Sequence, residues 1–304
     1  MNTSPRAPSR IGAWLRRGAT AACLCAAPFA HAYAQALLLF PEGTVTLIRG
    51  TSVFEVDTPL VTQPGDILTT DTRLGAQLED GNGMLAALGP QTRLTIDAPP
   101  RGADASGAAS LSLLTGWIKL ARSAAPGQWL LDTPTLRVAL QQGSSAIHAT
   151  STATALFVET GSAAVTLPET RDAPQTLGAD RYLAREFGKP AVQSARPAAV
   201  FVSQLPLTFR DPLAPVAAHA QTRPATPTQG RPVAYEDVAD WLACGLAVRR
   251  TFVLRFRPLA HTEPFRTQIR LNLHALPEWR PVLYPPPPLP PRRPSGPRLS
   301  AEES

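Results

Sequence analysis

The stretch that decides the fold reads GTVTLIRG at residues 43–50 and PGDILTTDTRLGAQLEDGNG at residues 64–83. It continues with LLTGWIKLA at residues 113–121, TPTLRVALQQGSSAIHA at residues 133–149 and VETGSAAVTL at residues 158–167. Short segments that alternate apolar and polar residues are separated by turn residues about every ten positions, which is the pattern of short β-strands. Strands at this spacing favour a sandwich, roll or jelly-roll barrel over a parallel α/β fold.

Glycine and aspartate mark the turns between these segments. The dipeptides Asp80-Gly81 and Asn82-Gly83 suit positive φ and predict a hairpin. Acidic residues beside a hairpin could hold a cation, but Asp at a turn more often accepts hydrogen bonds from neighbouring backbone N–H groups, so we favour the structural role. We expect seven positions to shape turns: Gly65, Asp66, Asp80, Gly81, Gly116, Gly143 and Gly161.

In order and spacing, these segments resemble the FecR domain, the periplasmic module of ferric-citrate-type regulators and of stand-alone secreted bacterial proteins. The matching positions are Gly43, Val45, Gly50, Gly65, Asp66, Ile67, Thr69, Asp80, Gly81, Leu113, Gly116, Thr133, Pro134, Gly143, Gly161 and Val165. The chain departs from the family pattern at Ser144, where Thr is usual, and at His148, where an apolar residue is usual. The resemblance implies a β-sandwich or jelly-roll-type domain over residues 37–190 that senses or docks a partner.

The N-terminus predicts export. Four arginines within the first 17 residues precede residues 18–40, which contain no charged residue, and Ala32-Tyr33-Ala34 offers a cleavage site. This is the pattern of a secretory signal peptide over residues 1–34. The alternative is an uncleaved membrane anchor, although a proline and several polar residues make the run a poor span. About 17 residues before an apolar run are too few for the cytoplasmic anti-sigma region of the FecR regulators, so we expect only the periplasmic half.

Cysteine content and charge limit the partners. Cys23 and Cys25 belong to the predicted signal peptide, which leaves Cys244 alone, and its apolar neighbours predict a buried helix residue. The net charge of +6 falls to about +2 once the four N-terminal arginines are removed. Residues 35–230 hold 14 basic and 16 acidic groups, whereas residues 231–304 hold 11 and 7. This balance argues against a nucleic-acid partner.

Candidate catalytic residues do not form a recognisable set. His148, His219, His261 and His274 have no neighbouring acid and Ser in the order of a nucleophile elbow, and no P-loop, GxGxxG, HExxH or EF-hand loop occurs. Trp117 and Trp129 lie in alternating segments and are better core residues than sugar-stacking residues. We therefore expect no enzyme activity, no cofactor and no metal.

The amino-acid composition of the chain changes after the β domain. Residues 191–232 form an Ala, Pro and Thr-rich linker in which only residues 201–209 are apolar enough to dock. Residues 233–280 predict short helices over 235–247, 248–257 and 263–275, which end at Pro258 and Pro277. Residues 281–304 form a Pro-rich tail, for which a stiff disordered segment is the default and a polyproline II ligand the alternative.

The helical region combines the residue types that are enriched at protein interfaces. The candidate partner surface comprises Trp241, Arg249, Arg250, Phe252, Arg255, Phe256, Arg257 and Trp279. The opposing interpretation is that the aromatic residues pack on the β domain and that the arginines are its solvated face. The sequence therefore predicts a non-enzymatic periplasmic docking module for an envelope protein or cell-wall component, which meets the membrane only if its N-terminal segment is uncleaved. The leading alternative is a carbohydrate-binding or carbohydrate-cleaving β protein.

Overall fold

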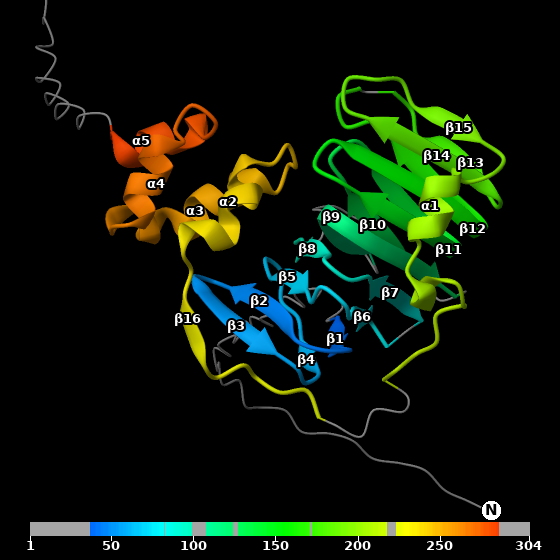
Figure 1. Ribbon diagram of the computed structural model, residues 1–304, viewed down its shortest axis with the longest axis horizontal. Coiled ribbons are helices and arrows are strands. Elements are labelled where there is room, and N and C mark those ends of the chain that lie inside the picture. Colours follow the sequence, from blue (N-terminus) through cyan, green and yellow to red (C-terminus); the bar gives the residue numbers. More distant parts are fainter. Residues whose placement is uncertain are drawn as a thin grey trace, which may run out of the picture. The chain divides into compact units, whose positions relative to one another are not determined.

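In a computed structural model, the chain is a mainly β protein with short helices toward its C-terminal end, which confirms the predicted fold class (Figure 1). The structure describes residues 37–81, 83–98, 108–123, 127–170, 172–217 and 223–285. The predicted signal peptide, His219 and residues 286–304 of the predicted tail lie outside the described residues. The predicted domain limits stay predictions.

The first part of the β module consists of short antiparallel strands. They are β1 (Leu38–Pro41), β2 (Val45–Arg49), β3 (Ser52–Val56), β4 (Leu60–Val61), β5 (Ile67–Thr70), β6 (Ala76–Glu79), β7 (Met84–Leu88) and β8 (Arg93–Ile96). Strand β2 pairs with β3 and β5, and β5 pairs with β8. Strands β6 and β7 pair through the turn at Asp80-Gly81, as the sequence predicts.

The second part contains three long strands, β9 (Ala108–Arg122), β11 (Arg137–Ala149) and β12 (Ala153–Thr166), together with shorter ones. The shorter strands are β10 (Gln128–Asp132), β13 (Gln175–Gly178), β14 (Arg181–Glu186) and β15 (Val192–Ser194). The sheet runs in the order β15-β14-β12-β11-β10-β9-β8-β5-β2-β3-β16, where β16 (Gly230–Pro232) comes from the predicted linker. All these pairings are antiparallel except that of β9 with β10.

Three predicted turn glycines lie inside long strands instead, where φ is positive: +105° at Gly116, +93° at Gly143 and +72° at Gly161. Each lies where its strand changes partners. Strand β9 pairs with β8 and β10 before Gly116 and with β7 and β11 after it. A Cβ atom on Gly143 would lie 2.1 Å from the carbonyl oxygen of Thr160. Glycine therefore permits the bends by which one sheet encloses a core.

The main core lies within this bent sheet. It contains Leu47, Leu68, Ile118, Trp129 and Leu156, all fully buried, together with residues from most other strands. Alternate residues of β2 and β12 point inward, which is the period-two pattern that the sequence shows. Burial of these side chains is the main stabilising contribution to the β module.

The C-terminal region forms short helices close to the predicted ones. They are α2 (Tyr235–Ala243), α3 (Arg249–Phe256), η3 (Arg257–His261), α4 (Phe265–Leu271), η4 (Pro277–Trp279) and α5 (Arg280–Leu283). Helix α2 begins where the Asp237 carboxylate accepts the N–H of Ala234 at 2.8 Å. Pro258 and Pro277 lie in the first turns of η3 and η4, because a first-turn N–H has no helical partner to lose. They begin new turns rather than ending the helical path.

Candidate functional site

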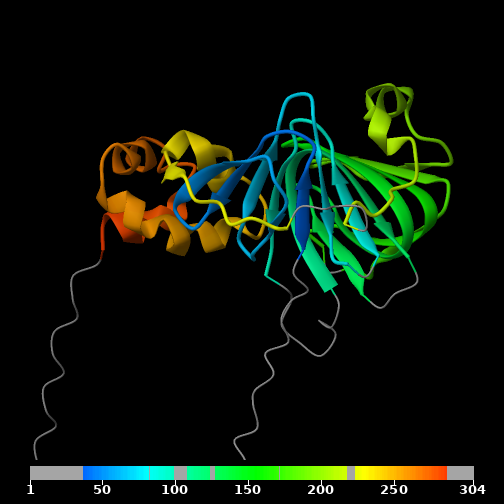
Figure 2. The same ribbon diagram turned by 90° about the horizontal axis from the view of Figure 1, so that it is seen from below.

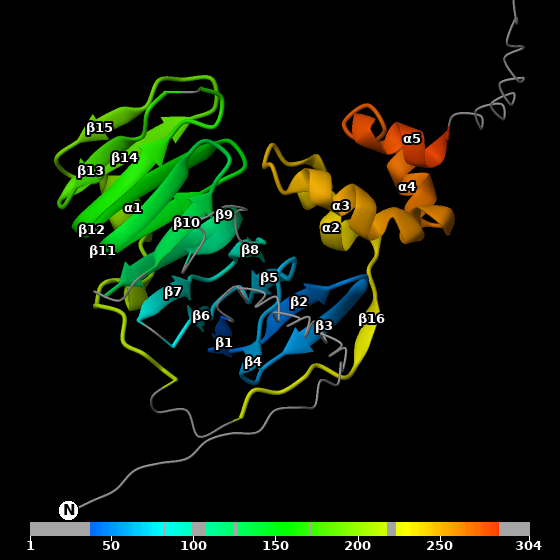
Figure 3. The same ribbon diagram turned by 180° about the vertical axis from the view of Figure 1, so that it is seen from behind.

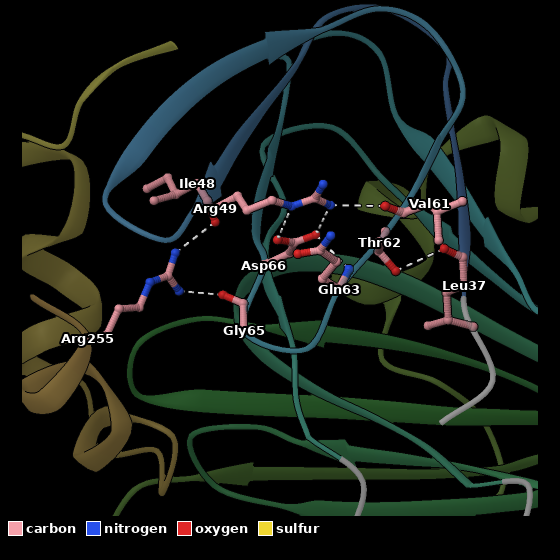
Figure 4. Close-up of polar contacts among 9 residues, drawn as sticks. All are labelled: Leu37, Ile48, Arg49, Val61, Thr62, Gln63, Gly65, Asp66 and Arg255. Carbon is pink, nitrogen blue, oxygen red and sulfur yellow. Dashed lines mark hydrogen bonds and ion pairs between the residues drawn. The ribbon is translucent and has the colours of Figure 1, made fainter. Parts of the chain in front are cut away.

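Asp66, one of the predicted structural residues, is buried in the turn before β5 (Figure 4). Nε and Nη2 of Arg49 donate to its two carboxylate oxygens at 2.9 and 2.6 Å, and the N–H of Gln63 donates at 2.8 Å. Nη2 of Arg49 also donates to the carbonyl oxygen of Val61 at 3.0 Å. Asp66 therefore holds a turn together through charge-assisted hydrogen bonds.

Arg255 reaches from α3 to the same turn (Figure 4). Its Nε donates to the carbonyl oxygen of Gly50 at 2.7 Å, its Nη2 to that of Ile48 at 2.9 Å, and its Nη1 to that of Gly65. Burial lowers the pKa of Arg255 to about 10, and the charge of Asp66 opposes that shift. The guanidinium is charged at neutral pH and fastens α3 to the β module, so it does not belong to an exposed partner surface.

The hairpin at Asp80 is also built as a turn. Oδ1 of Asp80 accepts the N–H of Met84 at 2.9 Å, and Gly81 has a φ of +77°. A Cβ atom on Gly81 would meet no atom within 4 Å, so only the backbone conformation favours glycine there.

The four aromatic residues predicted for the partner surface are buried instead. They are Trp241, Phe252, Phe256 and Trp279. They form a second core with Ile48, Val53, Ile67 and Leu114 of the β module. Aromatic side chains gain much free energy from burial, and the helices are too short to enclose a core alone. Their apolar faces therefore pack on the sheet.

Arg249 is likewise occupied within the chain. It forms a two-point ion pair with Glu278, in which Nη2 lies 2.8 Å from Oε2. Its Nη2 also donates to the carbonyl oxygen of Ala275 at 2.7 Å. Burial acts to raise the pKa of Glu278, but the hydrogen bond from Arg249, a backbone hydrogen bond and the charges of Arg249 and Arg250 together lower that pKa. Arg249 thus joins the start of α3 to η4.

Arg250 and Arg257 remain exposed on α3 and at the start of η3. They lie on either side of Leu254, which is also exposed, at helical spacings of four and three residues. No ion pair joins either arginine to another residue in the part of the chain that the structure describes. Of the predicted partner surface, these two side chains are therefore the ones available to a partner.

An open cleft of about 590 Å³ lies beside Arg250, between the helices and the β10–β11 turn. One wall contains Asp132 and Arg137, whose carboxylate oxygen and Nε are 3.2 Å apart. Burial raises the pKa of Asp132, and Arg137 opposes the shift. The other wall contains residues 244–247, Arg249, Arg250 and Glu278. The cleft therefore offers one unpaired positive charge beside two ion pairs.

Sequence reasoning did not identify Asp132, Arg137 and Glu278 as cleft residues. Asp132 and Arg137 face each other across the β10–β11 turn, but Glu278 comes from a segment far from them in the chain, and no local motif marks the three as a set. Only the fold brings them together.

Charge is unevenly distributed along the helical region, of which Arg249, Arg250 and Glu278 line the cleft. Residues 249–283 contain seven arginines and two glutamates. Two of the three acids of α2 form ion pairs, Asp237 with Arg231 and Asp240 with Arg93, whereas Glu236 is exposed. The exposed arginines of the helical region without an ion pair in the described chain are Arg250, Arg257, Arg270 and Arg280. This surface is therefore suited to negatively charged groups.

The residues considered for other chemistry lie in separate places. His148 is half-buried and stacks on Trp117, with 4.4 Å between ring centroids, and burial lowers its pKa. Trp117 and Trp129 are buried, as the sequence predicts. Cys244 is also buried, which raises the pKa of its thiol. Among the described residues, no group of three or more His, Cys, Asp or Glu side chains is placed to hold a metal ion.

Two comparisons with known proteins return no match: no protein-family model and no curated protein matches the sequence. Among solved structures, the chain resembles two crystal structures described as a "putative anti-sigma factor" from Parabacteroides distasonis ATCC 8503, at 16% and 15% identity. Each match covers 46% of this chain and less than two thirds of the neighbour, 63% and 64%, with a TM-score of 0.37. That score is too low to establish a shared fold. Separately, none of the helices in the described ranges has the length and apolar character to cross a bilayer.

Proposed function

We propose that this chain is a non-enzymatic docking module of FecR type that holds an acidic protein partner in the cell envelope. The cleft beside Arg250 is the docking site, and the exposed arginines of the helical region extend it. The observation that carries the proposal is the surplus of seven arginines over two glutamates in residues 249–283, with four of these arginines exposed and without an ion pair in the described chain. The envelope location rests on the predicted signal peptide of residues 1–34, and the FecR assignment rests on the order of the β motifs.

Charge complementarity supports a protein partner with acidic side chains. Arg250 and Arg257 present charges at fixed positions on either side of Leu254, an exposed apolar contact. Such a mixed stripe suits the rim and centre of a protein interface, where arginine is enriched. Rim charges act mainly by steering association, so binding through this surface weakens as salt rises.

No observation favours the carbohydrate alternative over docking. A glycan site needs exposed aromatic rings beside paired acids. Trp117 and Trp129, the rings considered for that role, are buried in the sheet.

Site-specific photo-crosslinking in intact cells tests the proposal. A photoreactive amino acid at position 254, between Arg250 and Arg257, keeps both charges and should crosslink to one acidic envelope protein, identified by mass spectrometry. The matched position is Arg181 on β14, which is exposed and lies outside the helical region. The same crosslinker there should not capture that protein.

A charge reversal then tests the contact itself. Arg250→Glu should reduce binding of the identified partner at least tenfold, because a reversed charge at a complementary interface costs more than about 1.4 kcal/mol. Arg181→Glu makes the same change in net charge and should leave binding unchanged. Equal loss in both variants would mean that net charge, rather than this cleft, determines association.

A further inference from the structure

One segment of the predicted linker lies across the β sheet without joining it. This strap, residues 198–217, contains α1 (Ala199–Gln204) and η2 (Leu207–Phe209) and lies on the outer side of the sheet (Figures 1 and 2). The view from behind shows the opposite side of the same strands (Figure 3). The backbone hydrogen bonds of the strap, such as that from the N–H of Phe209 to the carbonyl oxygen of Pro206, close local turns. In the described chain, none joins the strap to a strand.

Two phenylalanines provide the buried apolar contacts of the strap, and the half-buried Leu205 and Leu213 pack against the same cluster. Phe201 and Phe209 are buried, whereas most other strap residues are exposed. Phe201 packs against Trp117 and Tyr182, with ring centroids 4.9 and 5.3 Å apart. Phe209 belongs to the same cluster, together with Ala146 of β11. The sheet thus receives two aromatic side chains that are eight residues apart.

A buried lysine binds the main chain of the strap. Lys119 of β9 is 2% exposed, and its Nζ donates to the carbonyl oxygens of Phe209 at 2.7 Å and Asp211 at 3.0 Å. The third contact of Nζ is the Glu159 carboxylate at 2.9 Å. Since an ammonium group has three N–H donors, all three have acceptors, and two of these acceptors are strap carbonyls.

A buried acid binds the strap farther along. Glu79 of β6 is 1% exposed; its Oε2 accepts the N–H of Ala217 at 3.1 Å, and its Oε1 accepts the N–H of Val216. The neighbouring Gln77 donates from Nε2 to the carbonyl oxygen of Ala214 at 2.8 Å. The sheet therefore holds the strap by polar contacts to main-chain atoms.

These contacts are those of a site that binds a peptide largely irrespective of its sequence. Main-chain groups are common to all peptides, and specificity comes from pockets for a few side chains. We propose that this face of the sheet, formed by β6, β7, β9, β11, β12 and β14, is a peptide-binding site that the strap occupies in the free protein. A partner peptide with two aromatic side chains eight residues apart, followed by an irregular segment, replaces the strap. This site is separate from the cleft beside Arg250 and does not depend on the function proposed for it.

Competition between the strap and a free peptide tests the proposal. The probe is a fluorescent synthetic peptide of residues 197–217, and the control peptide has alanine in place of both phenylalanines. The proteins are the full chain and its Phe201→Ala/Phe209→Ala variant, with folding checked by circular dichroism. In fluorescence anisotropy, the variant should bind the probe at least tenfold more tightly than the unchanged chain, whose strap competes at high effective concentration.

Selectivity for the probe over the control peptide distinguishes this site from nonspecific binding. The control peptide should bind the variant at least tenfold more weakly than the probe, and Gln77→Ala in the same background should weaken probe binding severalfold. If the folded variant binds neither peptide, or both equally, the proposal is wrong. A variant that becomes a dimer in size-exclusion chromatography would also overturn it, because the occupant would then be the strap of a second copy.

Hydrogen exchange of the unchanged chain gives an answer even if the variant fails to fold. The amides of Val216 and Ala217, which donate to Glu79, should exchange through a local opening whose rate is nearly independent of low denaturant concentrations, while the amide of Ile147 in β11 exchanges through larger unfolding. Exchange of all three amides by global unfolding alone would mean that the strap is a fixed part of the core, which contradicts the proposal.

Discussion

Asp97 is predicted to destabilise the protein at neutral pH, and replacing it by asparagine should reverse the effect. The carboxyl group follows β8, and Oγ of Ser112 donates to its Oδ2 at 2.6 Å. Its Oδ1 is buried and has no hydrogen-bond partner in the described chain. Burial raises the pKa of Asp97 to about 7; the charge of Asp132 adds to the shift, and the hydrogen bond from Ser112 opposes it.

The direction in which pH changes the stability follows from which state of the chain holds the proton. Between the unfolded value of 3.8 and the folded value of about 7, the folded chain keeps a proton that the unfolded chain has lost. The free energy of unfolding therefore falls by about 1.4 kcal/mol per pH unit across that window, from this group alone. Stability is retained at acidic pH and lost as pH rises toward 7. Between pH 4.5 and pH 8 the loss amounts to about 3 kcal/mol.

Urea unfolding of the unchanged chain and of Asp97→Asn at pH 4.5 and pH 8 measures this loss. Because asparagine does not titrate, the variant should gain about 3 kcal/mol relative to the unchanged chain between the two pH values. Asp57→Asn is the matched control, since Asp57 is exposed. If the stability difference between Asp97→Asn and the unchanged chain is the same at both pH values, Asp97 does not titrate in that window and the reasoning is refuted.

The remaining predictions concern the turns, the helical region and export. Gly81→Val should lower the free energy of unfolding by about 1 kcal/mol or more, because φ is +77° there. Gly178→Val is the control: a Cβ atom at position 178 would also meet no atom within 4 Å, but φ is not positive, so the loss measured by thermal unfolding should be smaller. Arg255→Met should cost about 3 kcal/mol, because three carbonyl groups lose a charged donor; a melting temperature close to that of the unchanged chain would contradict the contact. Arg249→Glu should lower the melting temperature by placing a like charge beside Glu278, while Arg250→Glu should change stability by less than about 0.5 kcal/mol. Intact-mass measurement of the periplasmic form should give an N-terminus between Tyr33 and Ala36, and a membrane-bound form that retains Met1 would contradict export with cleavage.

The sequence predicts the β class because its signals are local. The hairpin between β6 and β7 is marked by the adjacent dipeptides Asp80-Gly81 and Asn82-Gly83, and the period-two pattern of β2 is visible within five residues. The roles of Gly116, Gly143 and Gly161 were predicted less well. Positive φ serves a turn and a mid-strand bend equally, and the difference depends on which strands pair on each side of the glycine. That pairing is not local.

The contacts of the strap show that buried polar residues are also hard to predict from local sequence. Its apolar stretch at residues 201–209 was predicted to dock, and Phe201 and Phe209 are buried. Lys119 carries no such signal, because a lysine in an alternating strand normally faces water. Its burial depends on carbonyl groups of Phe209 and Asp211, about ninety residues later, which satisfy its donors.

Adjacent arginines illustrate why the partner surface was only half predicted. Arg249 and Arg250 are neighbours in sequence, but successive residues of a helix point about 100° apart. Both line the cleft, but Arg249 pairs with Glu278, whereas Arg250 forms no ion pair with the described residues. From composition alone, both arginines could contact a partner. In the structure, Arg249 hydrogen-bonds within the helical region and Arg255 hydrogen-bonds to the β module, and these contacts hold the helices in place. Charge available for docking is what remains after these internal contacts. A simultaneous reversal of Arg249 and Arg250 would thus confuse unfolding with loss of binding, and only the single change at Arg250 separates the two.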